Sequence, residues 1–316
     1  MGCAPMPQVA SDRALERACA AGHSLFVSAQ DGLRLHVRAH GAHTDRALPV
    51  VCLPGLARTT ADFDTLAVAL ASDRERPRRV LALDYRGRGK SDYDRKPANY
   101  NLQVELADVL SVLTALGVGR AVFVGTSRGG ILTMLLAVAR PTAIAGCVLN
   151  DIGPVIDLEG LMRIKGYLGK LPALASFAAA AEALKQRFGS LFPKWSDDDW
   201  LAFARATFKE DSGRLVPDYD PKLATILEAI GPAQPLPTLW KEFDALGRVP
   251  VMVIRGANSD ILSAATVEGM RKRRRALELF EVPEEGHAPR LAGALTIDRI
   301  AGFIASCDAT GSGYRN

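Results

Sequence analysis

The apolar positions of this chain fall into short runs that alternate with longer amphipathic stretches. The runs have strand length and are rich in β-branched residues, whereas the stretches between them repeat apolar positions every three or four residues. The expected strands are 48–53, 79–83, 122–125, 144–150, 249–255 and 276–282, and the expected helices are 60–71, 102–116, 131–139, 264–274 and 292–305. This alternation predicts an α/β fold with a mostly parallel, twisted sheet and helices on both faces.

The two ends of the chain depart from this alternation. Two strand-like runs, 25–29 and 33–39, are joined at Asp31-Gly32, which is typical of a hairpin turn. Residues 1–23 are expected to form an N-terminal extension that is loose or helical. The Gly- and Ser-containing residues 307–316 are expected to form a flexible tail.

The strand–helix alternation is interrupted between residues 153 and 237. This stretch contains only helix-like patterns, at 158–167, 173–188, 197–208 and 222–229, and it closes with Pro232, Pro235 and Pro237. We therefore expect a helical cap, 153–237, inserted into a core made of 24–152 and 238–306. Most cap aromatics should pack within the cap, while one or two should form an apolar wall of the site: Phe177, Phe188, Phe192, Trp195, Trp200, Phe203, Phe208 and Tyr219.

Composition narrows the class of protein. The 316 residues are 48% hydrophobic and 23% charged with a net charge of +4, as in ordinary globular proteins, which gives no indication of nucleic-acid binding. The basic run 271–275 is expected to be a solvated helix face. The five cysteines lack metal or disulfide spacing, and no run of 18 apolar residues or signal-peptide pattern occurs. We expect a cytoplasmic protein without a membrane partner; the sequence leaves a homodimer open.

One motif joins the central strand to the helix that follows it. Gly125-Thr126-Ser127-Arg128-Gly129 matches G-x-S-x-G, in which a sharp turn strains the serine backbone and requires small residues on either side. The turn lifts the hydroxyl clear of the sheet, and the following helix directs free N–H groups and its positive dipole end toward it. Ser127 is therefore predicted to be a nucleophile.

A serine nucleophile needs a base and a carboxylate partner. His287 and Asp260 each follow a late strand, so both should reach the same sheet edge as Ser127. Histidine suits the base role, and a carboxylate fixes its tautomer. Asp151, which follows the strand after the nucleophile, is an alternative to Asp260. We favour Asp260 because the tight turn 256–260 should present its side chain, and expect Asp151 to anchor the start of the insertion.

The oxyanion of the reaction needs two N–H donors in a dry site. The donors expected here are the N–H of Arg128, directly after the nucleophile, and the N–H of Leu56, in the loop after the first parallel strand. The glycine-rich loop 84–92 lacks the pattern of a phosphate-binding loop, so we expect it to be a structural loop that borders the site.

Four motifs together resemble the α/β-hydrolase superfamily over residues 24–306: Leu53-Pro54-Gly55-Leu56, the loop 84–92, Gly125-Thr126-Ser127-Arg128-Gly129-Gly130, and Gly286-His287-Ala288-Pro289 preceded by Asp260. The chain is most similar in kind to bacterial capped serine hydrolases such as enol-lactonases, carboxylesterases and meta-cleavage C–C hydrolases. One departure is that Pro54-Gly55 stands where many family members have His-Gly.

The resemblance and the residues together predict hydrolysis of a carboxylic ester or lactone through an acyl-enzyme, without metal or cofactor. Two alternatives remain: C–C bond hydrolysis of a meta-cleavage-type diketone, and a low-turnover ligand-binding sensor on the same fold. Haloalkane dehalogenase and epoxide hydrolase activities are disfavoured, because those enzymes resemble this chain but need a carboxylate where Ser127 stands.

Overall fold

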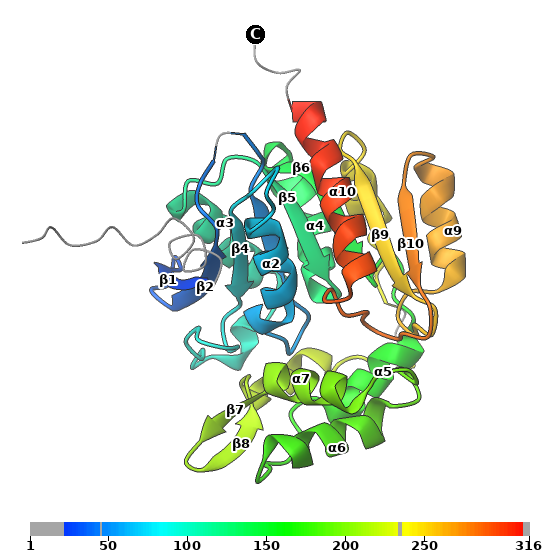
Figure 1. The fold of residues 1–316 in the computed structure, drawn as a ribbon. Coiled ribbons are helices and arrows are strands. Elements are labelled where there is room, and N and C mark those ends of the chain that lie inside the picture. The colour runs from blue at the N-terminus through cyan, green and yellow to red at the C-terminus, as the bar shows by residue number, and fades with distance from the viewer. Residues whose placement is uncertain (1–21, 45, 233–235, 312–316) are drawn as a thin grey trace, which may run out of the picture.

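A computed structural model describes residues 22–44, 46–232 and 236–311 of the chain. Within them, one sheet has the strand order β1-β2-β4-β3-β5-β6-β9-β10 (Figure 1). Pairing is antiparallel from β1 through β2 to β4 and parallel from β4 onward, which confirms the predicted hairpin and mostly parallel sheet. The strands are His23–Ser28 (β1), Arg34–His40 (β2), Val50–Leu53 (β3), Val80–Asp84 (β4), Ala121–Thr126 (β5), Ile144–Asn150 (β6), Val251–Gly256 (β9) and Glu278–Val282 (β10).

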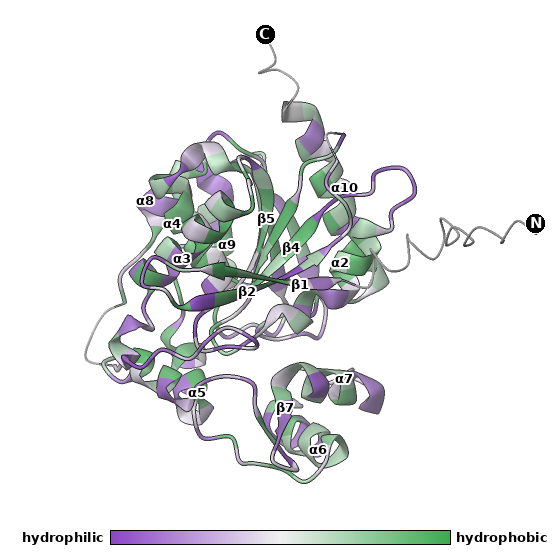
Figure 2. Cartoon of the chain, turned by 90° about the vertical axis from the view of Figure 1, so that its left-hand side faces the viewer, coloured by the Kyte–Doolittle hydropathy of each residue, from purple (hydrophilic) through white to green (hydrophobic). Residues whose placement is uncertain are grey.

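Helices cover both faces of the sheet, as its apolar strands require. Alternate residues of β5 face opposite layers, since Phe123 joins one hydrophobic cluster and Val122 and Val124 join the other. Helices α2 and α10 lie over one face, and α3, α4 and α8 over the other (Figure 2). The core helices are Asp64–Ala71 (α2), Leu102–Ala115 (α3), Arg128–Ala139 (α4), Trp240–Ala245 (α8), Ala264–Arg273 (α9) and Ala294–Gly311 (α10), with short 3-10 helices Thr60–Phe63 (η1), Pro97–Asn99 (η2) and Pro141–Ala143 (η3).

The segment inserted between β6 and α8 forms a separate layer at one end of the sheet (Figure 1). It contains the predicted helical segments but also an antiparallel hairpin, β7–β8, so the expectation of a purely helical cap is wrong. The hairpin turn is Ser212-Gly213, with φ of 51° and 76°. Both residues have positive φ, as type I′ hairpin turns require. The cap elements are Leu158–Tyr167 (α5), Phe177–Phe188 (α6), Asp197–Thr207 (α7), Phe208–Asp211 (β7), Arg214–Pro217 (β8) and the 3-10 helix Pro221–Leu227 (η4).

The chain ends differ from expectation at one place that the structure describes. Helix α10 continues to Gly311, so 307–311 are helical instead of part of a flexible tail. Asp308 explains the extension, because its carboxylate accepts hydrogen bonds from the Leu48 N–H at 2.9 Å and from the guanidinium of Arg78 at 3.0 Å. The remaining tail residues and all but Gly22 and His23 of the expected N-terminal extension lie outside the described residues. Among the described helices, none has both the length and the apolar character needed to cross a membrane.

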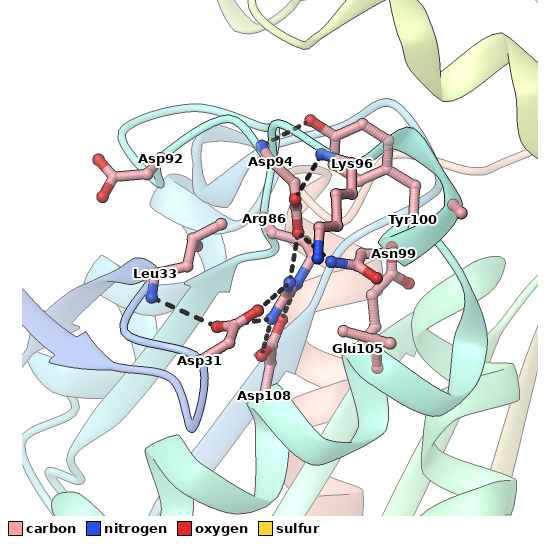
Figure 3. A network of polar contacts seen from close by, with 12 residues as sticks. Asp31, Leu33, Arg86, Asp92, Asp94, Lys96, Asn99, Tyr100, Glu105 and Asp108 are labelled. Carbon is pink, nitrogen blue, oxygen red and sulfur yellow. Dashed lines mark hydrogen bonds and ion pairs between the residues drawn. The ribbon is translucent and has the colours of Figure 1, made fainter.

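A buried arginine fixes the loop 84–92 that follows β4 (Figure 3). The Arg86 guanidinium is 2% exposed and lies 2.6 Å from Asp94, 2.6 Å from Asp108 of α3 and 2.9 Å from Asp31 in the β1–β2 turn. One cation thus joins its own loop to helix α3 and to the β1–β2 turn, which are both distant from it in sequence. The loop has the structural role that the sequence predicts, and it borders the edge where the parallel strands end.

We expect the free energy of unfolding of Arg86→Met to be about 3–5 kcal/mol lower than that of the parent. The substitution leaves the carboxylates of Asp94 and Asp108 buried without their cation. The neighbouring Arg95 is exposed, so Arg95→Met should stay within about 0.5 kcal/mol of the parent. Urea unfolding followed by circular dichroism measures both. Equal stability of the two variants would contradict this role of Arg86.

Candidate active site

Ser127 occupies a strained turn between β5 and α4. Its backbone has φ 50° and ψ −112°, outside the regions that side-chain-bearing residues normally adopt. The turn brings α4 very close to the sheet. A Cβ atom on Gly129 would lie 2.0 Å from the carbonyl oxygen of Leu53, and one on Gly125 would lie 2.6 Å from the backbone of Gly129. Only glycine fits at these two positions, which explains the spacing of the motif.

The hydroxyl of Ser127 is hydrogen-bonded to His287. The distance from Ser127 Oγ to His287 Nε2 is 2.9 Å, and the other ring nitrogen, Nδ1, lies 2.8 Å from Oδ2 of Asp151. An ionised carboxylate can only accept hydrogen bonds, so the proton of the neutral imidazole lies on Nδ1 and is donated to Asp151. This leaves Nε2 as the acceptor for the serine hydroxyl. Three side chains from the ends of β5, β6 and β10 therefore form one continuous hydrogen-bonded line.

Asp151 is held in place by several donors. It directly follows β6, has φ 54°, and its side chain is fully buried. Its Oδ1 accepts a hydrogen bond from the Gly256 N–H at 2.8 Å, and its Oδ2 accepts one from the Ser259 hydroxyl at 2.6 Å. These donors fix the carboxylate in the plane from which it contacts His287.

The structure does not bring Asp260 to His287, in contrast to our expectation. The carboxylate of Asp260 pairs with Arg163 of α5 instead, at 2.5 and 2.8 Å. The reason lies in the turn, where the preceding Ser259 directs its hydroxyl to Asp151 while Asp260 faces the cap. Burial alone would raise the pKa of Asp260, but the hydrogen bond and charge of Arg163 outweigh it and lower that pKa below its ordinary value.

One feature of the sequence favours Asp151: it follows the next strand along the chain after the nucleophile strand. In the sheet, β6 pairs directly with the nucleophile strand β5, and the Ser127 N–H donates to the carbonyl of Asn150 at 2.9 Å. Asp151 therefore starts beside Ser127. Both candidate aspartates follow strands that end at the same edge, so the pattern alone could not decide between them.

A cavity of about 220 Å³ lies above Ser127 and His287, between the sheet edge and the cap. Its walls are mainly apolar, with Leu168, Leu171 and Leu184 among the cap side chains. The cap aromatics contribute more than the one or two expected. Five of those named from the sequence line the cavity: Phe188, Phe192, Trp195, Phe203 and Tyr219. Trp200 and Phe208 pack within the cap's own cluster, as expected.

Three arginines join the cap to the core around this cavity. Arg58 of the core donates to the Thr207 hydroxyl at 2.6 Å, and Arg290 pairs with Asp199 at 2.5 Å. Arg163 of the cap completes the set through the Asp260 pair described above. Arg58 also pairs with Asp62, so each of these three cations has a carboxylate partner and the cavity presents few uncompensated charges to a ligand.

Leu56 and Arg128 lie in the two segments that border Ser127, and the oxyanion role of their N–H groups stays a prediction. Leu56 lines the cavity, and a Cβ on the adjacent Gly55 would be 3.9 Å from that of Ser127. Arg128 begins α4, where amide N–H groups have no acceptor within the helix. In the described ranges of the chain, no group of three or more His, Cys, Asp or Glu side chains could hold a metal ion.

This chain is similar in sequence to known hydrolases. A 3-hydroxybutyrate-oligomer hydrolase from Cupriavidus necator is 34% identical over 84% of this chain and 91% of its own. A 2-(acetamidomethylene)succinate hydrolase from Mesorhizobium japonicum is 25% identical over 79% of this chain and 85% of its own.

Among solved structures, an α/β hydrolase from Novosphingobium aromaticivorans is 42% identical and superposes with a TM-score of 0.84 over 90% of this chain and 98% of its own. The model of the alpha/beta hydrolase family matches residues 50–299, which include the sheet from β3 to β10, the inserted cap and the Ser127–His287–Asp151 line. This protein is a hydrolase that belongs to the α/β-hydrolase family.

Proposed function

We propose that this protein hydrolyses carboxylic esters with Ser127 as nucleophile, His287 as general base and acid, and Asp151 as the carboxylate that orients the histidine. The observation that carries the proposal is the unbroken hydrogen-bonded line from Ser127 Oγ through His287 to Asp151, at the base of an apolar cavity. Asp151 takes the place that the sequence had suggested for Asp260.

In this mechanism the Ser127 oxygen attacks the ester carbonyl carbon while its proton moves to His287 Nε2. The carbonyl oxygen becomes an oxyanion, which accepts hydrogen bonds from the N–H groups of Leu56 and Arg128. His287 then gives the proton to the leaving alcohol as the C–O bond breaks and the acyl-enzyme remains. Water, deprotonated by the same imidazole, releases the acid and restores Ser127. Asp151 stabilises the transient imidazolium.

The cavity and a relative together favour a short aliphatic ester as substrate. About 220 Å³ is below the usual range for drug-sized ligands, and the walls are leucine and aromatic side chains. The Cupriavidus necator relative is named for hydrolysis of 3-hydroxybutyrate oligomers. We therefore propose linear oligoesters of short hydroxy acids as substrates, with small lactones as a second ester class. A substrate panel distinguishes these from diketone C–C bonds, and turnover itself distinguishes an enzyme from a sensor.

Replacing the nucleophile tests the reaction. We expect Ser127→Ala to lose about 10³-fold or more in kcat toward p-nitrophenyl butyrate and 3-hydroxybutyrate dimers, because no acyl-enzyme can form. A fluorophosphonate probe, located by mass spectrometry, should label Ser127 in the parent and nothing in the variant. Turnover by Ser127→Ala at the parental rate would refute the proposal.

Replacing the two aspartates tests the assignment of the carboxylate. Asp151→Asn should lower kcat by about 10⁴-fold, because an amide at this position favours the wrong imidazole tautomer. Asp260→Asn should lower kcat by less than about tenfold, with its main effect on KM through the weakened Arg163 tie between cap and core. The opposite order of the two variants in steady-state kinetics would show that Asp260 is the catalytic carboxylate.

A further inference from the structure

We propose that Glu105 of α3 is a positioning residue that holds the two oxyanion-stabilising amides, those of Leu56 and Arg128, through a buried chain of charged side chains. The inference rests on the proposed ester hydrolysis. It concerns a residue that touches neither substrate nor the Ser127–His287–Asp151 line.

Glu105 lies between two arginines in the interior. Its side chain is fully buried, with Oε2 2.5 Å from Nε of Arg128 and Oε1 2.8 Å from Nη1 of Arg88. Burial would raise the pKa of Glu105, but the two guanidiniums outweigh it and lower that pKa, so the group is a carboxylate at neutral pH. One end of this chain is therefore the side chain of Arg128, whose backbone N–H begins α4.

At its other end, this row of charged side chains reaches the loop that contains Leu56. Arg88 is fully buried and its Nε donates to the carbonyl oxygen of Leu56 at 2.8 Å. The neighbouring carbonyls of this loop are also held, since Tyr85 donates to that of Pro54 at 3.2 Å and the Arg58 N–H donates to that of Gly55 at 3.3 Å.

These contacts set the direction of the amide. In a trans peptide the C=O and the N–H point to opposite sides, so the hydrogen bond to the carbonyl of Gly55 fixes where the Leu56 N–H points. The contact of Arg88 with the next carbonyl holds the following peptide plane. A single carboxylate thus anchors, through two arginines, both segments that supply the amides.

The buried row of side chains Arg88, Glu105 and Arg128 also carries unbalanced charge. It contains two guanidiniums, of Arg88 and Arg128, and one carboxylate, and Nη2 of each arginine is buried without a hydrogen-bond acceptor in the described part of the protein. Positive charge in a region of low dielectric, beside the turn at Ser127, favours an oxyanion as it develops. Glu105 fixes the position of that charge without cancelling it.

Helix α3 supplies a matched control one turn further on. Asp108 is a buried carboxylate that pairs with the buried Arg86, and this pair ties the β1–β2 turn to the loop 84–92 (Figure 3). The donors to the carbonyls of the Leu56 loop are other residues, as described above. Glu105 and Asp108 therefore lie on the same helix, and each is buried and pairs with a buried arginine. They differ in whether the arginine leads to the proposed amides.

The test compares Glu105→Gln, Arg88→Lys and the control Asp108→Asn with the parent. We measure kcat and KM for p-nitrophenyl butyrate and the second-order rate of Ser127 phosphonylation by a fluorophosphonate, whose phosphoryl oxygen needs the same amides. Glu105→Gln and Arg88→Lys should each lower kcat and the phosphonylation rate about tenfold or more, with KM within about threefold of the parent. Asp108→Asn should lower Tm yet keep kcat within about twofold.

Two results would overturn the inference: parental kcat and phosphonylation rate in Glu105→Gln and Arg88→Lys, or an equal fall of both in Asp108→Asn, which would indicate a general effect of stability. If Glu105→Gln does not fold, Arg88→Lys decides alone, because it keeps the charge count while removing the Nε that contacts Leu56. Failure of the parent itself to be labelled at Ser127 would refute the proposed function instead.

Discussion

The close approach of helix α4 to the sheet is the constraint on which the site depends. Because Gly129 and Gly125 carry no side chain, α4 can start almost against β3 and β5, and Ser127 is forced into its positive-φ conformation. The strain is held by the interior, where the Ser127 N–H donates to the carbonyl of Asn150. The same approach places the first turn of α4, with its free N–H groups, beside the hydroxyl.

A second group of side chains shows that hydrogen bonds alone do not make such a site. Ser24 Oγ lies 2.9 Å from His36 Nε2, and His36 Nδ1 lies 2.7 Å from Asp84 Oδ2, which repeats the order of the Ser127 line. Ser24, however, is an exposed residue of β1, away from the cavity. Asp84 also accepts the N–H of Thr60, so the group fixes the start of η1. What distinguishes Ser127 is the strained turn, the enclosed apolar cavity and the adjacent amides.

Buried and half-buried arginines connect the parts of this fold. Arg86 joins the antiparallel edge to α3, Arg88 joins α3 to the Leu56 loop, and Arg163 joins the cap to the core. A planar guanidinium has five donors, so one side chain can contact a carboxylate and a backbone carbonyl together. Burying such charges is costly unless they are paired, which makes each connection sensitive to loss of one partner.

The sequence by itself determined the strands of the sheet, its helices α2, α3, α4, α9 and α10, and the positions of Ser127 and His287 at one edge, but it did not predict the short helix α8. Strand-length apolar runs and the glycine spacing are local patterns, and the alternation of strands and helices allows few topologies other than a parallel sheet. The choice between Asp151 and Asp260 required the tertiary structure, because the direction of a side chain in a turn depends on its neighbours. Ser259 and Arg163 decide it here. The hairpin β7–β8 and the full length of α10 likewise depend on a short turn and on distant partners of Asp308, contacts that periodicity does not reveal.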